Sequence, residues 1–461
     1  MDRLPLSLSY LSIPMIHQEL TRKKFIQQTM GAIGYGIAAS AIPTSTYAME
    51  TPERLLSSKA LIFKNVLLET GFERDDFEIT GTKTALFSMV VEDGKIKSIG
   101  PNSNIKGAID AKGYLLLPAM KDMHIHLDKT YYGGKWKATS KRQRSVQDMI
   151  SLEEKILPEM LKTSTARAES LIELLQSKGT DFARSHVNIE PSSQLNSLKH
   201  LYKAIENKKG SFGVEIVAFP QHGLFKSKSE GLMREAAQMD IDFIGGLDPQ
   251  NIDGDIEKSI DFTVQLALDY KRGIDIHLHE SGESGFKTVQ YLIKKVNENP
   301  ELKGKTFLSH CFALGKLQGK VLEETCEQLA AARIGIISTI PFGGLIMPIP
   351  TLYKHGVSVM TGTDSVVDHW SPFGTGSMLQ KANLMAQLYG YSTELELSRC
   401  LKIATNNVLP LDEQGNQQWP KPGDQADFNL VEASCSAEAV ARQSTIKALY
   451  HKGSCAYQNL A

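Results

Sequence analysis

Short apolar runs alternate with longer stretches of helical spacing through the middle of the chain, and residues 152–175 and 255–270 fit helices. The apolar runs that qualify as strands are Tyr114–Ile125, Asp181–Ile189, Val214–Phe219, Phe243–Leu247, Ile274–Leu278, Thr306–His310, Ile334–Thr339 and Val357–Thr361. Eight strand–helix units within fewer than about 300 residues are typical of one α/β architecture, the (β/α)8 TIM barrel. A doubly wound sheet is the alternative, but no Gly-x-Gly-x-x-Gly motif follows the first strand.

Both flanks of this middle region have the alternating pattern of β-strands. Near the start, residues 60–67, 86–91 and 96–99 qualify, and Glu92-Asp93-Gly94-Lys95 is a hairpin turn. Near the end, residues 426–431 and 446–450 qualify. We therefore predict one small β-sandwich formed from both chain ends, with residues 49–115 and 408–461 flanking a metal-dependent barrel of residues 116–407.

The first 48 residues differ from the globular pattern. Three basic residues at positions 22–24 precede an apolar run over residues 30–42, and Thr46-Tyr47-Ala48 ends this segment. A basic region, an apolar region and a small-residue ending are the layout of an export signal. The segment resembles a twin-arginine signal, although Lys23 stands where a second arginine is usual. We predict a periplasmic or extracellular protein without a stable membrane span; a cytoplasmic protein is the alternative.

Composition narrows the class of ligand. The chain of 461 residues has 51 basic and 52 acidic residues, so there is no electrostatic support for nucleic-acid binding. Its five cysteines include no Cys-x-x-Cys motif, which argues against a disulfide framework or a thiolate metal site. A small-molecule substrate fits this composition best, and a homo-oligomer is left open.

Metal-ligand side chains follow several of the predicted strands. The first strand ends in His124-Ile125-His126, the fifth in His277, the sixth in His310, and Asp364 follows the eighth. Residues two apart in a strand point to the same side, and the active sites of barrels lie at the C-terminal strand ends. A single histidine at a strand end is more often structural, but this combination predicts a divalent metal site.

Longer motifs surround these residues. They are Leu117-Pro118, His124-Ile125-His126-Leu127-Asp128-Lys129, Ala218-Phe219-Pro220-Gln221, His277-x-x-Glu280, Ser309-His310, Gly362-x-Asp364 followed by Asp368, Trp370, Pro372 and Gly374, and Gly423-Asp424-Gln425-Ala426-Asp427. With these motifs, the chain resembles the amidohydrolase superfamily over about residues 57–455. Within that superfamily it resembles the cytosine deaminase-like group.

The resemblance implies a role for each matching residue. The ligands of one divalent ion, zinc or iron, would be His124, His126, His277 and Asp364. The catalytic residues would be Asp364, Glu280 as a proton shuttle, and His310 as the group that orients the attacking water; Gln221 and Trp370 would contact the substrate. Residues 243–249 lack the lysine that bridges two metals in other members, which favours a single ion.

The function implied is hydrolysis of a non-peptide C–N bond in a cyclic amidine or amide, by a metal-activated water. Deamination of a nitrogen heterocycle is the leading hypothesis. Release of an amine from an N-substituted ring or acyclic amide is the second, and a non-catalytic binding relative is the third. Ser365, His222 and His279 depart from the residues usual in cytosine deaminases. Ser365 would face the substrate beside the metal, so we expect a substrate other than cytosine.

Overall fold

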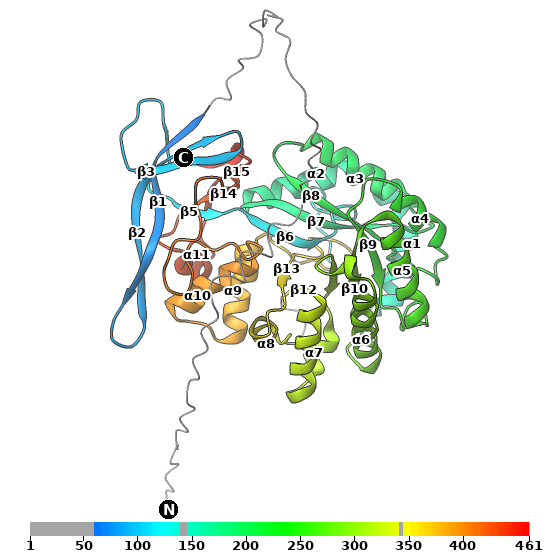
Figure 1. Cartoon of the computed structure of the whole chain (residues 1–461). Helices are drawn as coiled ribbons and strands as arrows, with labels where there is room; N and C mark the ends of the chain where they lie inside the picture. Colours follow the sequence, from blue (N-terminus) through cyan, green and yellow to red (C-terminus); the bar gives the residue numbers. More distant parts are fainter. Residues whose placement is uncertain (1–59, 139–144, 341–343, 461) are drawn as a thin grey trace, which may run out of the picture. The chain divides into compact units, whose positions relative to one another are not determined.

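A computed structural model describes residues 60–138, 145–340 and 344–460, which belong to one compact unit, Ser58–Ala461 (Figure 1). The predicted leader, residues 1–48, lies outside these ranges, and export stays a prediction. Within the described ranges, no helix is sufficiently long and apolar to cross a membrane.

Eight parallel strands form the barrel that the sequence predicts (Figure 1). In order around the sheet, they are β6 (Met120–Ile125), β7 (Thr180–Asn188), β8 (Gly213–Phe219), β9 (Phe243–Leu247), β10 (Gly273–His277), β11 (Thr306–Ser309), β12 (Ile334–Ser338) and β13 (Val359–Thr361). A parallel bridge between Ile125 and Asp364 joins the first strand to the segment after the last. The seam of the barrel therefore lies at the predicted metal ligands.

Helices follow most of these strands and cover the barrel with apolar faces. They include α1 (Val146–Leu161), α2 (Ser164–Ser177), α3 (Asn196–Asn207), α4 (Glu230–Ala237), α5 (Ile256–Tyr270), α6 (Glu283–Glu298), α7 (Gly319–Ala332) and α9 (Met378–Tyr389). In α5, the Asp255 side chain caps the helix by accepting from the Lys258 backbone N–H at 3.0 Å. Leu171, Leu198, Val264 and Leu292 are among the fully or almost fully buried residues of the barrel core.

The predicted strand Tyr114–Ile125 is wrong as a single strand. The chain instead forms β5 (Leu115–Pro118) in the second sheet and β6 in the barrel. Pro118 has no backbone N–H to continue a ladder, and the next two N–H groups bond to Asp427 and Gly179. The chain thus passes from one sheet to the other at this proline.

The second sheet is mixed and combines described segments from both flanks of the barrel, as predicted. Its order is β16 (Ser454–Gln458), β15 (Ile446–His451), β14 (Phe428–Val431), β5, β1 (Leu61–Arg74), β2 (Ile79–Glu92) and β3 (Lys95–Pro101), with β4 (Ile109–Asp110) paired to β1. Phe63 packs edge-on against Phe428 and Tyr450, with ring centroids 5.5 and 5.1 Å away. Aromatic side chains from both ends therefore share one core.

Candidate metal centre and active site

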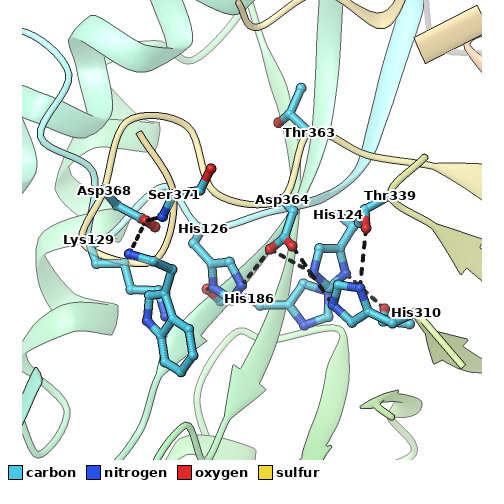
Figure 2. Close-up of polar contacts among 12 residues, drawn as sticks. His124, His126, Lys129, His186, His310, Thr339, Thr363, Asp364, Asp368 and Ser371 are labelled. Atoms are coloured by element: carbon cyan, nitrogen blue, oxygen red, sulfur yellow. Dashed lines mark hydrogen bonds and ion pairs between the residues drawn. The ribbon is translucent and has the colours of Figure 1, made fainter. Parts of the chain in front are cut away.

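Four predicted ligands converge at the C-terminal ends of the barrel strands, as Figure 2 shows for three of them. His124 and His126 come from the end of β6, His277 ends β10, and Asp364 follows β13. Asp364 Oδ1 lies 3.5 Å from His124 Nε2 and 3.4 Å from His126 Nε2. One ligand atom from each of His124, His126 and His277 falls within 4.8 Å of the others. This spacing suits ligands around one ion.

The ring nitrogens of His126 and His124 that face the centre carry no proton. His126 Nδ1 donates to the backbone carbonyl of His186 at 3.1 Å, which leaves Nε2 as the unprotonated nitrogen. Burial, together with the Lys129 ammonium, lowers the pKa of His126 to about 4, so its ring is neutral at pH 7. A neutral imidazole is the form that binds a metal.

A relay of hydrogen bonds fixes His124 in the same way. The Ser309 hydroxyl donates to Asp275 Oδ1 at 2.7 Å, so its oxygen accepts from His124 Nδ1 at 2.8 Å. Arg184 donates to the other oxygen of Asp275 at 3.0 Å. His124 Nε2 therefore presents a lone pair to the centre, and it is buried without a hydrogen-bond partner among the described residues.

The donor set fits a divalent cation. Both ring nitrogens of His277 are buried without a hydrogen-bond partner in the described part of the chain, and burial lowers the pKa of His277 well below its usual value. Phe219 stacks on this ring at 4.0 Å and holds its orientation. Lone pairs of histidines and a carboxylate would repel one another at these distances without a cation between them. These residues would hold zinc or iron, and either ion suits them.

We expect one tightly bound divalent ion per chain, because the predicted ligands form one centre and β9 has no lysine. Chelation should lower the melting temperature, and excess zinc or iron should restore it. An ion present at 1,000 times its dissociation constant stabilises the folded state by about 4 kcal/mol. Elemental analysis and calorimetry check both points; two tightly held ions per chain would contradict the first.

A cavity of about 780 Å³ opens beside this centre. Its lining includes His126, Lys129, Gln221, His277, His279, His310, Phe312, Asp364, Ser365, Trp370 and Leu384. The volume is in the range of small-molecule sites, and the lining combines aromatic with polar side chains. The predicted substrate-contacting residues Gln221, Ser365 and Trp370 thus lie on one cavity.

His310 also lies beside the centre, with Nε2 4.0 Å from Asp364 Oδ2. Its Nδ1 lies 3.3 Å from the Thr339 hydroxyl, which sets the plane of the ring (Figure 2). A water molecule between His310 and Asp364 would contact both side chains. The role of His310 in orienting the attacking water stays a prediction.

Backbone donors hold one oxygen of Glu280, and its other oxygen, Oε2, is buried without a hydrogen-bond partner among the described residues. Glu280 is buried, but it is not among the described residues that line the cavity. Its Oε1 accepts from the backbone N–H groups of Gln250 and Asn251 at 2.9 and 3.0 Å. The neighbouring His279 lines the cavity and donates from Nδ1 to Asp248 at 2.9 Å. Proton shuttling by Glu280 stays a prediction, and His279 is a second candidate.

Three further residues near the cavity, Glu153, His369 and Lys381, have no role among the predictions from the sequence. Lys381 and His369 line the cavity, and Glu153 is fully buried behind it. The sequence could have indicated that Glu153 is buried, because this residue lies on the apolar face of α1 between Ile150 and Leu157. A charged residue at a buried helix position requires a partner.

Comparison with known proteins identifies the family. A model of the amidohydrolase family matches residues 189–457, more than half of the chain. The uncharacterized protein YahJ of Escherichia coli (strain K12) is 50% identical over 402 residues, covering 86% of this chain and 87% of YahJ. The chain belongs to the amidohydrolase family, and it is therefore a hydrolase acting on C–N bonds.

Two solved structures share the fold. N-isopropylammelide isopropylaminohydrolase from Burkholderia multivorans is 27% identical with a TM-score of 0.75, covering 87% of this chain and 99% of that chain. 5-methylcytosine deaminase from Klebsiella pneumoniae, liganded with 5-fluorocytosine, is 24% identical with a TM-score of 0.72, covering 86% and 97%. The resemblance predicted from the sequence motifs is confirmed.

Proposed function

We propose that this protein is a mononuclear metal-dependent hydrolase that removes an exocyclic nitrogen from a small nitrogen heterocycle. The observation that supports the proposal most is the convergence of unprotonated ring nitrogens of His124 and His126 with the Asp364 carboxylate, at the edge of a cavity. When bound there, a divalent ion lowers the pKa of a water molecule toward neutrality.

The side chains around the cavity divide the chemistry among them. Asp364 accepts a proton from the attacking water, and His310 orients that water. The water oxygen forms a bond to the ring carbon, and the exocyclic C–N bond breaks. The leaving nitrogen takes up a proton, so that it departs as neutral ammonia or amine.

The cavity lining favours a flat ring that bears an oxygen. Lys129 Nζ donates to the side-chain carbonyl of Gln221, so the Gln221 amide N–H₂ and the remaining ammonium hydrogens are donors. Ring carbonyl oxygens accept from such donors. Trp370 and Phe312 supply aromatic surface for the ring, and Leu384 adds apolar surface. We propose an oxo-substituted pyrimidine, pterin or triazine as the substrate class.

A second candidate function is the release of an alkylamine rather than ammonia. Two observations favour it: the likeness to N-isopropylammelide isopropylaminohydrolase, and the apolar side chains of the cavity, which suit an N-alkyl group. Both candidates use the same water attack and differ in the substituent on the leaving nitrogen.

A screen for ammonia and amine release tests both candidates. Metal-loaded protein is incubated with oxo-substituted pyrimidines, pterins and triazines, with and without an N-alkyl group. We expect turnover of at least one heterocycle that is faster than turnover of cytosine, because Ser365 stands where a second carboxylate is usual. Ammonia release supports the first candidate, and alkylamine release supports the second. No release from any member by protein with a full metal content would contradict the proposal.

A further inference from the structure

One buried carboxylate lies behind the cavity and touches several parts of its wall. Glu153 of α1 has 0% exposure, yet it belongs neither to the metal centre nor to the cavity lining. A carboxylate removed from water in this way requires compensating donors or cations. The donors around Glu153 identify the parts of the cavity wall that this carboxylate connects.

Each oxygen of this carboxylate has its own set of partners. Oε2 accepts from His369 Nε2 at 2.9 Å and from Trp370 Nε1 at 3.0 Å. Oε1 accepts from the Asn188 side-chain amide, and it lies 3.8 Å from Lys129 Nζ and 4.0 Å from His222 Nε2. Although burial raises the pKa of Glu153, Lys129 and His369 hold it well below its usual value. The side chain is therefore an anion at neutral pH.

The partners of Glu153 come from four strand ends around the barrel. Lys129 follows β6, Asn188 ends β7, His222 follows β8, and His369 and Trp370 lie in the segment after β13. Three of the five, Lys129, His369 and Trp370, line the cavity. Lys129 Nζ also lies 5.5 Å from the centre of the Trp370 ring, so the ammonium and the indole contact each other as well as the carboxylate.

The helix that carries Glu153 is itself part of the cavity wall. Val146 and Met149 line the cavity, and Glu153 follows on the same helical face, four residues after Met149. Glu153 thus connects a wall formed by α1 to walls formed by the loops after β6 and β13.

We propose that Glu153 is a positioning residue for substrate recognition: its carboxylate fixes the Trp370 indole, the Lys129 ammonium and helix α1 in one arrangement around the cavity. This inference rests on the proposed function as far as substrate is concerned. It concerns how the wall is held and assigns Glu153 no contact with substrate or metal.

The test replaces Glu153 by glutamine, which has the same shape but lacks the charge and one acceptor oxygen. Its N–H₂ group would face the donors of either His369 and Trp370 or Asn188 and Lys129, so one pair must move. Glu154→Gln is the matched control, because Glu154 is the next residue of α1 and is exposed.

Two readouts separate this role from a general loss of structure. In ¹⁵N-tryptophan spectra, the indole Nε1–H resonance of Trp370, assigned from Trp370→Phe, should shift in Glu153→Gln and not in Glu154→Gln. With the best substrate from the screen, KM should rise by about 10-fold or more, while the metal content stays at one ion and kcat falls less than KM rises. A shifted indole without any turnover would contradict the proposed function and not the role of Glu153.

Glu153→Asp keeps the negative charge beside Lys129 if the glutamine variant fails to fold. Its side chain is one methylene shorter, so it cannot reach all partners at their present distances. We expect the same indole shift and a smaller rise in KM. An unchanged indole resonance and unchanged KM in a folded Glu153 variant would overturn the proposal, as would a fall in kcat and metal content with KM unchanged.

Discussion

Replacing Asp364 by asparagine should reduce kcat by at least about 1,000-fold, which is the largest single effect that the structure predicts. General base catalysis contributes about 100- to 10,000-fold, and this position also supplies the anionic ligand of the centre. The substitution would place an amide where Asp364 Oδ1 now lies 3.5 and 3.4 Å from two unprotonated imidazole nitrogens. The N–H₂ group of that amide can donate to those nitrogens, so the fold should survive.

The measurements for Asp364→Asn are kcat, metal content and melting temperature, each compared with Asp76→Asn. Asp76 is exposed in the turn between β1 and β2 and has no part in the centre. We expect reduced metal content and a smaller stabilisation by added zinc, with a melting temperature of the metal-free protein close to that of the unchanged chain. Retention of one-tenth or more of the original kcat would exclude Asp364 as the proton acceptor.

The elements of this fold that the sequence predicts well are those set by local pattern. Most barrel strands have a short apolar run, although β6 and β7 contain charged residues. The ligands lie at or just after strand ends, so spacing alone places His124 beside His126. The closing bridge between Ile125 and Asp364 spans most of the barrel sequence. No local sequence pattern indicates this bridge; only the prediction of a closed barrel implies that the first and last strands meet.

Predictions from the sequence fail where the structure depends on contacts between residues far apart in the chain. Tyr114–Ile125 reads as one extended segment, yet the backbone changes sheets at Pro118. Glu153 lies on a helix far along the chain from His369 and Trp370, and no spacing rule connects residues so distant in sequence. Only the assembled barrel shows that its charge is compensated there.

The direction of the side chains after His277 is a point that the sequence leaves open. Strand β10 ends at His277, so the alternation of sides no longer applies to His279 and Glu280. The motif His277-x-x-Glu280 therefore specifies which residues are present, but not which of them faces the cavity. In the structure, His279 lines the cavity and Glu280 bonds to the backbone of residues 250–251.

If His279 supplies the proton, His279→Asn should reduce kcat by about 100-fold or more, and Glu280→Gln should cost less than about 10-fold. The leaving nitrogen needs a proton, and a group that supplies it must reach the cavity. His279 lines the cavity and donates from Nδ1 to Asp248, so Nε2 is the ring nitrogen on the side away from that carboxylate. Asparagine can keep the bond to Asp248 through Nδ2, and it removes Nε2 together with the ring that contacts His310 and Phe312.

Glutamine at position 280 is an equally conservative change. Its carbonyl can accept from Gln250 and Asn251 as Glu280 Oε1 does, at 2.9 and 3.0 Å, so the loop should keep its position. Both variants should bind one ion, because neither residue is among the predicted ligands. The measurement is kcat against pH for the two variants and the unchanged chain, on one substrate. If Glu280→Gln loses as much turnover as His279→Asn or more, Glu280 turns toward the substrate during the reaction and is the proton shuttle that the resemblance implies.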